Sequence, residues 1–227
     1  MLAKKYKSEV VSVINPIEGI YTLEIKSLGR KFKFQPGQFL HLSLDNTYDG
    51  IGQWPDSRCF SMRSNPTEEN IKITYAVKGR FTKKMMEVLK VGSEIWLKLP
   101  YGDLFAQKHN KNNTVFIAGG TGITPFLSLF THLSFNEYIN PKIYLGFRSK
   151  SYNNYKDELG RSSNLTKYVK IFYEDDDGII DINKIFYENC STSNYFISGP
   201  PIMINIFMKE LIFNGVPKEN ILTDDWE

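Results

Sequence analysis

"VFIAGGTGITPFLSL", from Val115 to Leu129, joins a continuous apolar segment to a helical pattern through a glycine-rich turn. An apolar run of this kind is typical of a strand buried on both faces, as in a parallel sheet covered by helices. Pro125 stands where the first turn of a helix accepts proline, and Thr124 is expected to cap that helix. Amides in such a turn can approach a phosphate, although a tight turn without a ligand explains the same residues. The spacing is neither the Rossmann G-x-G-x-x-G nor a Walker loop.

The segments that follow alternate between the same two patterns. Strands are predicted at 114–118, 142–147, 168–173, 194–198 and 220–223, and helices at 125–133, 154–159, 182–189 and 202–215. Apolar strands that alternate with helices predict a parallel α/β sheet covered on both faces.

The first half of the chain has a different pattern. Segments rich in β-branched and aromatic residues, separated by glycine, proline and asparagine, predict strands at 8–14, 19–25, 31–35, 38–44, 59–62, 70–77 and 93–99. Many short strands with such turns predict an antiparallel barrel or sandwich. One helical piece interrupts them at 82–89. The polar stretch 106–113 is the best candidate linker, so we expect two domains, 1–108 and 112–227.

Composition excludes several classes of function. The 227 residues carry 28 basic and 25 acidic side chains without a basic stripe, so nucleic-acid binding is not expected. Two distant cysteines, Cys59 and Cys190, cannot supply the four thiolates of an iron–sulfur cluster, and the three histidines are scattered, so no metal site is expected. No apolar window approaches the roughly 18 residues of a membrane span. A cytoplasmic location is expected by default.

A second strand–helix junction, "FISGPPIM", begins at Phe196. Adjacent prolines, Pro200 and Pro201, cannot continue a strand or lie inside a helix, so the chain must turn sharply after Gly199. Open α/β sheets bind ligands outside the carboxyl ends of their strands, so this junction and the glycine turn are expected to line one crevice. A structural turn without a ligand is the alternative.

Two motifs in the first half point to a ligand with a phosphate and a flat ring. In "RCFSMRS", Arg58 and Phe60 share one face of a strand, where guanidinium suits phosphate and the aromatic ring suits stacking. In "VKGRFTKKM", Gly79 and Thr82 form a cap-like cradle for a phosphate. The alternatives are a buried phenylalanine beside a surface arginine, and ordinary helix capping by Thr82.

Taken in order, "R-x-F-S-x-x-S", "G-x-F-T", "PYGDLF", "GGTGITP", "SGPPIM" and an acidic-x-aromatic tail resemble the ferredoxin–NADP⁺ reductase superfamily. The resemblance covers nearly the whole chain. It implies an antiparallel flavin-binding β-barrel domain followed by an α/β, Rossmann-like domain for a nicotinamide nucleotide. It also implies hydride transfer from nicotinamide C4 to flavin N5, and then electron transfer to a separate acceptor such as an iron–sulfur protein or a flavodoxin.

The resemblance implies roles for individual residues. Arg58 would hold the FAD pyrophosphate, Phe60 would stack on the isoalloxazine ring, and Ser61 would bond near its N5. The remaining FAD residues would be Cys59, Ser64, Val77, Lys78, Gly79, Arg80, Phe81 and Thr82. The nucleotide residues would be Gly119, Gly120, Thr121, Gly122, Thr124, Pro125, Arg148, Gly199, Pro200, Pro201 and Met203, with Gly199 giving clearance to the nicotinamide ring. The catalytic residues would be Ser61, Ser198, Asp224 and Trp226, with Trp226 also covering the flavin.

This chain departs from the superfamily's pattern at two positions. Ser198 stands where cysteine is usual, and a hydroxyl is smaller and less polarisable than a thiol. Asp224 stands where glutamate is common, and its shorter side chain reaches less far. The first departure is expected to alter the rate of hydride transfer or the position of the ring.

Charge favours NADH over NADPH. The acidic run Glu174–Asp177 would repel a 2′-phosphate and could accept from a free 2′-hydroxyl, whereas Arg148 and Lys150 argue for NADPH. A solvated loop explains the acidic run equally well.

Two other functions stay open. One is a free-flavin or ferric-chelate reductase, against which the "GRFT" cradle argues. The other is a non-catalytic electron-transfer or regulatory subunit, which Ser198 would fit. The sequence does not identify the acceptor or the oligomeric state.

Overall fold

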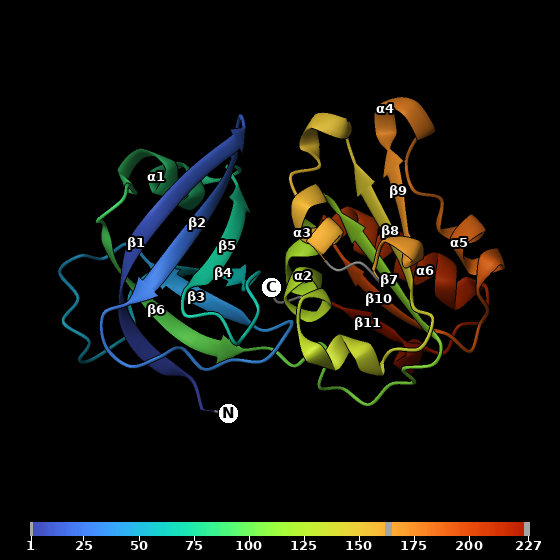
Figure 1. Ribbon diagram of the computed structural model, residues 1–227, viewed down its shortest axis with the longest axis horizontal. Helices are drawn as coiled ribbons and strands as arrows, with labels where there is room; N and C mark the ends of the chain where they lie inside the picture. Colours follow the sequence, from blue (N-terminus) through green and yellow to red (C-terminus); the bar gives the residue numbers. More distant parts are fainter. Residues whose placement is uncertain (1, 162–164, 225–227) are drawn as a thin grey trace. The chain divides into compact units, whose positions relative to one another are not determined.

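The computed structural model describes residues 2–161 and 165–224 (Figure 1). The chain divides into two compact units, Met1–Asp103 and Leu104–Glu227. This division lies five residues before the boundary expected at residue 108. The physical reason is that Leu104 and Phe105 pack into the core of the second unit, so the chain changes core before the polar stretch begins.

The first unit is a six-stranded antiparallel sheet with one helix. Its elements are β1 (Lys4–Ile17), β2 (Ile20–Ser27), β3 (Phe39–Ser43), β4 (Ser57–Ser61), β5 (Ile71–Ala76), α1 (Arg80–Val88) and β6 (Glu94–Tyr101). The strand order is β4-β3-β6-β1-β2-β5. Beyond the end of β4, the amide of Arg63 donates to the carbonyl of Lys72 at 2.8 Å. This bond joins the two edges of the sheet, which is therefore barrel-like.

Alternation along the strands decides which side chains fill the barrel. In β5, Ile71, Ile73 and Tyr75 are all buried, as period two requires. The segment 31–35 shows the same alternation, with Phe32 and Phe34 buried, yet it is not a strand. The prediction of a strand there was wrong because alternation reports burial, whereas a strand also needs a hydrogen-bonded neighbour.

The second unit is a five-stranded parallel sheet between helices. Its strands are β7 (Thr114–Gly119), β8 (Lys142–Phe147), β9 (Val169–Tyr173), β10 (Asn194–Ser198) and β11 (Ile221–Thr223). Its α-helices are α2 (Thr124–Phe130), α3 (Lys156–Arg161), α4 (Glu174–Asp177), α5 (Ile182–Glu188) and α6 (Pro201–Phe213). Its 3₁₀ helices are η1 (Gly120–Ile123), η2 (Leu133–Glu137), η3 (Lys150–Tyr152), η4 (Thr166–Tyr168) and η5 (Lys218–Asn220).

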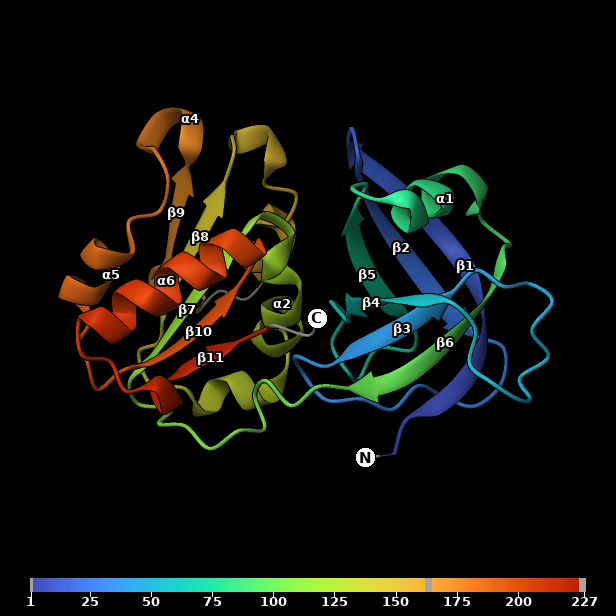
Figure 2. The ribbon, with the colours of Figure 1, turned by 180° about the vertical axis from the view of Figure 1, so that it is seen from behind.

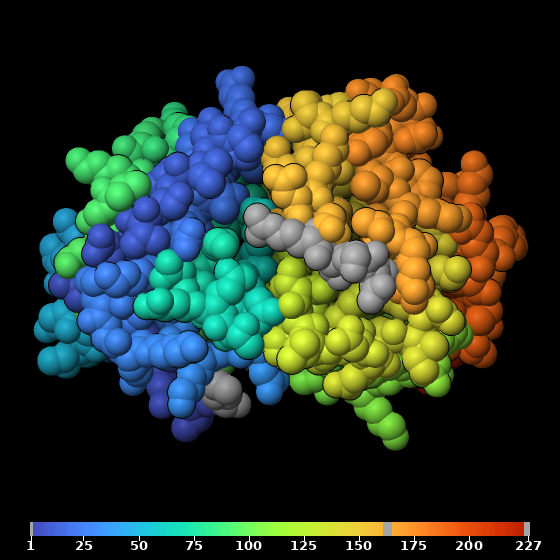
Figure 3. Space-filling model, viewed as in Figure 1, coloured from blue at the N-terminus to red at the C-terminus, as the bar shows by residue number. Residues whose placement is uncertain are grey.

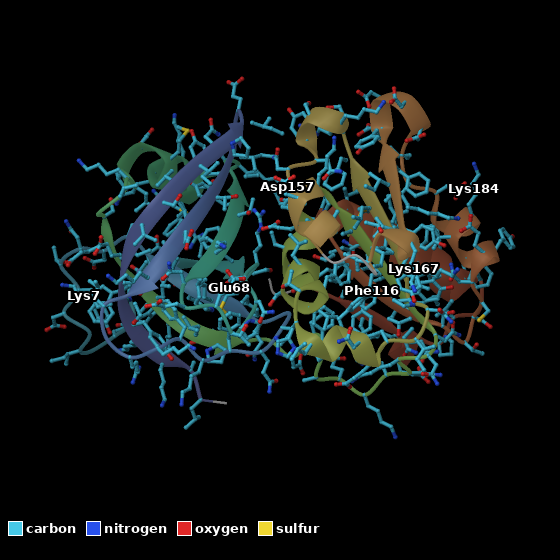
Figure 4. All side chains as sticks on the ribbon, viewed as in Figure 1. Lys7, Glu68, Phe116, Asp157, Lys167 and Lys184 are labelled. Atoms are coloured by element: carbon cyan, nitrogen blue, oxygen red, sulfur yellow. The ribbon has the colours of Figure 1, made fainter. Side chains whose placement is uncertain are left out.

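Helices cover both faces of this sheet, as the sequence predicted. Phe116, labelled in Figure 4, packs against α2 on one face, with ring-centroid distances of 5.5 Å to Phe126 and 5.4 Å to Phe130. On the other face, α5 and α6 pack against alternate residues of the same strands, including Val115 and Ile117. Figure 2 shows α6 and α5 on this second face. The predicted fold class, an antiparallel β domain followed by a parallel α/β domain, is confirmed.

The strand order β11-β10-β7-β8-β9 places a switch point at β7. The chain goes from β7 to β8 and β9 on one side, and returns to β10 and β11 on the other. In register, Ser198 of β10 lies beside Ala118 of β7. The carboxyl ends of these two strands therefore lie together at the place where open α/β sheets bind ligands. Within the described ranges, no helix is both long enough and apolar enough to cross a membrane.

Candidate functional site

The two strand–helix junctions of the second unit touch through their glycines. A β-carbon on Gly122 would lie 2.5 Å from the carbonyl oxygen of Ser198 and 2.5 Å from the α-carbon of Gly199. A β-carbon on Gly119 would lie 2.8 Å from the sulfur of Met203. Real β-carbons do not approach other atoms this closely, so only glycine allows this contact. "GGTG" and "SGPP" therefore form one structural unit, which we call the interlocked junctions.

Two other glycines of these junctions have different surroundings. Gly199 has φ +155, and a β-carbon there would lie 2.6 Å from Cε of Met203 and 3.1 Å from the amide nitrogen of Gly119. The position of the missing β-carbon of Gly199 is thus occupied by protein atoms, so glycine there allows this packing, and its clearance for a nicotinamide ring stays a prediction. Gly120 has φ +55, and a β-carbon there would meet no atom within 4 Å. Gly120 is therefore the glycine of this turn with open space beside it.

The helical start at this turn differs from the prediction. The residues Gly120–Ile123 form the 3₁₀ helix η1, which continues directly into α2. The hydroxyl of Thr124 donates to the carbonyl of Thr121 at 2.9 Å, and Ile123 precedes α2 without a side-chain cap. The expectation that Thr124 caps the helix was wrong because the glycine turn is itself helical. The first amides of such a turn have no partner within it, so they suit an anion.

The structure brings Ser198 and Asp224 together. Ser198, which is 2% exposed, donates from Oγ to Oδ2 of Asp224 at 3.3 Å. The amide of Asp224 donates to the carbonyl of Ile197 at 3.1 Å, which holds the segment after β11 against β10. Trp226, the predicted aromatic partner, lies outside the described residues.

The two motifs of the first unit also meet. Arg58 and Phe60 pair with Leu42 and Leu40 of β3, so they share the face that the sequence predicted. The guanidinium of Arg58 lies 5.3 Å from the ring centre of Phe81 in α1. "RCFS" and "GRFT" are therefore neighbours in space.

Arg58 stays accessible in this arrangement. Its guanidinium pairs with Asp56 at 3.0 Å, but the two side chains are 55% and 70% exposed. An ion pair exposed to this extent contributes little stability, so a phosphate can compete for the guanidinium.

The start of α1 forms the other side of this cradle. The hydroxyl oxygen of Thr82 accepts from the amides of Lys78 and Gly79 at 3.0 and 3.1 Å. Thr82 thus fixes the turn before the helix, as capping requires. The first-turn amides of α1 have no carbonyl partner in the helix, and Phe81 brings them close to Arg58. The same residues fix the helix start and leave its first amides without a partner in the helix, so the two interpretations of this motif are compatible.

The known proteins that this chain resembles agree with the family resemblance found in the sequence. A family model described as "Oxidoreductase NAD-binding domain" matches residues 116–209. The chain is 26% identical over 241 residues to "Propane 2-monooxygenase, reductase component" of Mycolicibacterium smegmatis, covering 97% of this chain and 67% of that protein. It is 28% identical over 212 residues to the "Probable dihydroorotate dehydrogenase B (NAD(+)), electron transfer subunit" of Pyrococcus furiosus, covering 91% and 76%.

A solved structure shares the fold over almost the whole of both chains. It is a ferredoxin NADP⁺ reductase from Neisseria gonorrhoeae with bound FAD and NADP, similar with a TM-score of 0.79 at 16% identity, covering 97% of this chain and 98% of that one. The chain thus shares the two-unit fold of ferredoxin–NADP⁺ reductases, and the curated proteins that it resembles include reductase components. The resemblance predicted from the sequence is confirmed in these terms, and the second unit carries the match to the oxidoreductase NAD-binding domain.

The carboxyl ends of β8 and β9 carry the charged residues from which the sequence predicted the nucleotide preference. Lys150 pairs with Asp176 at 2.6 Å. That bond and the negative charge of Asp176 raise the pKa of Lys150. The acidic run forms the one-turn helix α4 and lies on the surface (Figure 3). Arg148 packs over Tyr152, 5.8 Å from the ring centre. One of the two basic residues that argued for NADPH is thus neutralised by the acidic run.

Not every predicted flavin residue of this reductase joins Arg58 and Phe60. Cys59 points to the opposite face of β4, where its sulfur lies 3.5 Å from Nε2 of His41. Burial raises the pKa of Cys59, the opposite of what a reactive thiol needs. Ser64 is buried and accepts from the amide of Lys72 at 3.1 Å. Ser61 is also buried, and Val77 packs against the barrel core.

Sequence reasoning missed Tyr75 and the pairing of Asp176 with Lys150. Tyr75 packs edge-on against Phe60, with ring centroids 6.0 Å apart, and so supports the predicted stacking residue from inside the barrel. The alternation in β5 was the signal for it. No signal in the sequence pointed to the pairing of Asp176 with Lys150, because the two follow different strands.

Proposed function

We propose that this chain is a flavin-dependent NAD(P)H oxidoreductase that passes electrons from a nicotinamide nucleotide through FAD to a separate acceptor. The observation that carries the proposal is the pair of interlocked junctions at the switch point of an oxidoreductase NAD-binding sheet. An independent cradle of Arg58 and the start of α1 lies in the other unit. One unit thus has a place for a nucleotide and the other a place for a flavin.

The residues of the second unit fit a nicotinamide nucleotide. The amides of Gly120, Thr121 and Gly122 begin a helical turn, and open space lies beside Gly120, so they would hold a pyrophosphate. The Pro200–Met203 segment is fixed by its contact with Gly119 and would form the wall against the nicotinamide ring. Ser198 and Asp224 lie at the same edge. Their role is to position the ring, since reacting groups must be held at a defined distance and angle.

The residues of the first unit fit FAD. Arg58 and the first amides of α1 would bind its pyrophosphate, and Phe81 would hold the guanidinium in place. Phe60 is 8% exposed and supported by Tyr75, so it would present a fixed edge to the isoalloxazine ring. FAD, when bound, takes up a hydride and releases electrons one at a time. Ser61, buried beside Phe60, would bond near the flavin N5.

We infer a preference for NADH. Lys150 is engaged by Asp176, and Glu174 and Asp175 add exposed negative charge at the same edge. These charges disfavour the 2′-phosphate of NADPH and suit a free 2′-hydroxyl. NADPH stays the alternative because Arg148 is exposed nearby.

The acceptor is proposed to be an iron–sulfur or oxygenase protein. A relative that matches 97% of this chain is the reductase component of a propane monooxygenase. The two cysteines of this sequence cannot hold a four-thiolate cluster, so such a cluster lies outside it. Cys59 and Cys190 are both free thiols, which agrees with a reducing compartment such as the cytoplasm.

An anaerobic titration of the purified protein tests the proposal. We expect a yellow protein whose flavin absorbance bleaches with NADH faster than with NADPH, and which then reduces ferricyanide. Arg58→Ala should weaken FAD retention, whereas Lys83→Ala, at an exposed position of α1 beyond its first turn, should not. A protein that binds no FAD, or whose flavin NADH leaves oxidised, would contradict the proposal. A colourless protein that reduces added flavin would favour the free-flavin reductase instead.

A further inference from the structure

The structure brings two basic segments of the first unit together. One is the start of β1, "KKYK", and the other follows β2 and reads "GRKFKF". The strands β1 and β2 are antiparallel neighbours, so the start of one lies beside the end of the other (Figure 1). The amide of Leu28 donates to the carbonyl of Lys7 at 2.9 Å, and the guanidinium of Arg30 donates to the carbonyl of Lys5 at 2.6 Å. Two basic segments that are separate in the sequence therefore form one surface.

Arg30 and Lys4 meet at the ring of Tyr6. The guanidinium of Arg30 lies 4.7 Å from the ring centre of Tyr6, which is buried and packs on Phe32 with 5.1 Å between ring centres. Lys4 stands two residues before Tyr6, so it lies on the same side of β1. It is exposed, as is Arg30. Two positive charges therefore lie together over the ring that closes this part of the barrel.

The second segment adds two more charges by alternation. Phe32 and Phe34 are buried in the barrel core, whereas Lys31 and Lys33 are exposed. Because the phenylalanines point inward, the lysines between and before them point outward. The turn before this segment is fixed, since the hydroxyl of Ser27 donates to the carbonyl of Arg30 at 2.8 Å. We call the four exposed cations of this surface the barrel-end patch: Lys4, Arg30, Lys31 and Lys33.

No carboxylate of the described residues forms an ion pair with the barrel-end patch. The neighbouring Lys7, labelled in Figure 4, pairs with Glu94 at 2.8 Å and is therefore not counted in the patch. Uncompensated charges of one sign that lie close together produce a strong local potential. The patch is thus suited to a partner that presents several negative charges over an extended surface.

The side chains beside the cations indicate the kind of partner. Leu2 is 85% exposed and Leu28 is 41% exposed, and each precedes a patch residue by two positions. Single-stranded nucleic acids stack their bases on exposed rings, and protein interfaces are rich in aromatic residues and poor in lysine. The aromatic rings of these two segments are all buried: Tyr6, Phe32 and Phe34. Lysines beside exposed aliphatic side chains, without exposed rings, favour a lipid surface over both alternatives.

We propose that the barrel-end patch attaches this chain reversibly to the surface of a bilayer that contains anionic phospholipid. The four cations lie at the level of the lipid phosphates, and the aliphatic stems of the lysines reach toward the acyl chains. Leu2 and Leu28 enter the boundary between headgroups and acyl chains. Since charge supplies most of the attraction, the attachment is peripheral and weakens with salt.

Co-sedimentation of the purified full chain with lipid vesicles tests the proposal. We expect binding to phosphatidylcholine vesicles that contain about 30% phosphatidylglycerol, and none to vesicles of phosphatidylcholine alone. Raising the salt concentration from about 50 mM to about 500 mM should weaken binding at least about tenfold, because salt screens exposed charges.

Removing three charges from the patch should nearly abolish binding. The triple variant Lys4→Gln, Lys31→Gln and Lys33→Gln should bind anionic vesicles at least about thirtyfold more weakly, since each cation near such a surface contributes about fivefold. Arg30 is kept because it also bonds to the backbone of β1. The matched control removes the same charge from exposed lysines of the second unit and should weaken binding less than about threefold. It carries Lys142→Gln, Lys184→Gln and Lys218→Gln.

The outcomes separate the patch from misfolding and from other partners. Each variant should keep the unfolding temperature and flavin content of the wild type. A wild type that binds neither vesicle, as when the patch serves an acidic protein, overturns the proposal, and so does a patch variant that binds like the control. A short DNA duplex that the wild type binds more tightly than anionic vesicles, and the patch variant does not bind, assigns the patch to nucleic acid instead. None of these readouts uses electron transfer, so they are independent of the proposed activity.

A fluorescent probe tests which surface faces the bilayer. Leu28→Trp should show emission shifted to the blue when anionic vesicles are added, after subtraction of the signal from the three native tryptophans. Ile179→Trp, at a position of the second unit that is 77% exposed, should show no shift. A shift at position 179 and none at position 28 would show that a different surface meets the lipid and would overturn the proposal.

Discussion

The Ser198 hydroxyl donates a hydrogen bond to the carboxylate of Asp224, with 3.3 Å between Oγ and Oδ2. These are the two positions at which the chain departs from the pattern of the superfamily that it resembles. Both lie at the edge that carries the interlocked junctions, and Ser198 is almost completely buried there. A hydroxyl is a better hydrogen-bond donor than a thiol. We infer that serine and aspartate act as a pair at this edge.

Replacing the hydroxyl should slow the reaction without removing the flavin. We expect Ser198→Cys to retain FAD and to slow flavin reduction by NADH about threefold to tenfold, because the weaker thiol donor holds Asp224 less firmly. Rapid-mixing absorbance under anaerobic conditions measures this rate. Ser191→Cys, which adds a thiol elsewhere in the same unit, should leave it unchanged. A wild-type rate in the Ser198 variant would make Ser198 a packing residue only.

The pairing itself has a separate test. Asp224→Ala should slow flavin reduction by about the same factor as Ser198→Ala, since each removes one partner of the same bond. The double variant should then be no slower than either single variant, as expected for coupled residues. Rates that multiply in the double variant would show that the two residues act independently.

Gly122→Ala should destabilise the second unit. Its new β-carbon would lie 2.5 Å from backbone atoms of the neighbouring junction, and backbone cannot move aside as a side chain can. We expect a loss of about 1–3 kcal/mol in unfolding free energy, measured by urea denaturation, together with weaker NADH binding. Gly160→Ala, at a helical position with open space, should be neutral or slightly stabilising. A stable Gly122→Ala protein with normal NADH affinity would show that the junctions do not interlock.

Much of the fold follows from local pattern, since burial and hydrogen bonding act on neighbouring residues. Apolar runs such as Asn194–Ser198 are strands in the structure, and helical spacing located α6 within one residue at its start. Local pattern wrongly predicted a strand at 31–35, where buried and exposed side chains alternate but the backbone is not paired with a neighbouring strand. It also failed at Thr124, because glycine spacing does not reveal that the turn before it is already a 3₁₀ helix.

The contacts of the candidate site were less predictable because they join distant parts of the chain. Arg58 and Phe81 could be named separately, but only the curvature of the barrel brings them together. Gly122 and Gly199 meet because β7 and β10 are neighbours in the sheet. Neither sequence motif predicts that strand order. The family resemblance identified the candidate site residues, and only the structure showed which of them are in contact.

Removing one acidic side chain should shift nucleotide preference. Asp176→Asn frees the ammonium of Lys150 and removes a negative charge from the edge where we propose that NADPH would carry its 2′-phosphate. We expect kcat/KM for NADPH to rise about twofold to tenfold at low salt, with little change for NADH. Steady-state ferricyanide reduction measures both. Glu219→Gln, an exposed acidic change in η5, is the matched control. An effect of equal size in the control would point to net charge and not to this ion pair.

Two cysteine thiols with ordinary pKa values would be alkylated over the same pH range. In this chain, Cys190 should react at a lower pH than Cys59. Hydrogen bonds with Ser193, Thr192 and Asn113 lower the pKa of Cys190 to about 6, whereas burial raises the pKa of Cys59. The thiolate is the reactive form. Alkylation of Cys190 by iodoacetamide should therefore rise as pH passes about 6 and level off by about pH 7, because the thiolate is then fully formed.

Mass spectrometry of peptides alkylated over a range of pH reads out both cysteines in one sample. Cys59 should stay largely unmodified until the pH exceeds its raised pKa, and it therefore serves as the internal reference. Ser193→Ala removes the largest stabilising hydrogen bond on the Cys190 thiolate and should move its alkylation midpoint to higher pH. Equal midpoints for the two cysteines, or a Cys190 midpoint that Ser193→Ala does not move, would show that these hydroxyls do not stabilise the thiolate.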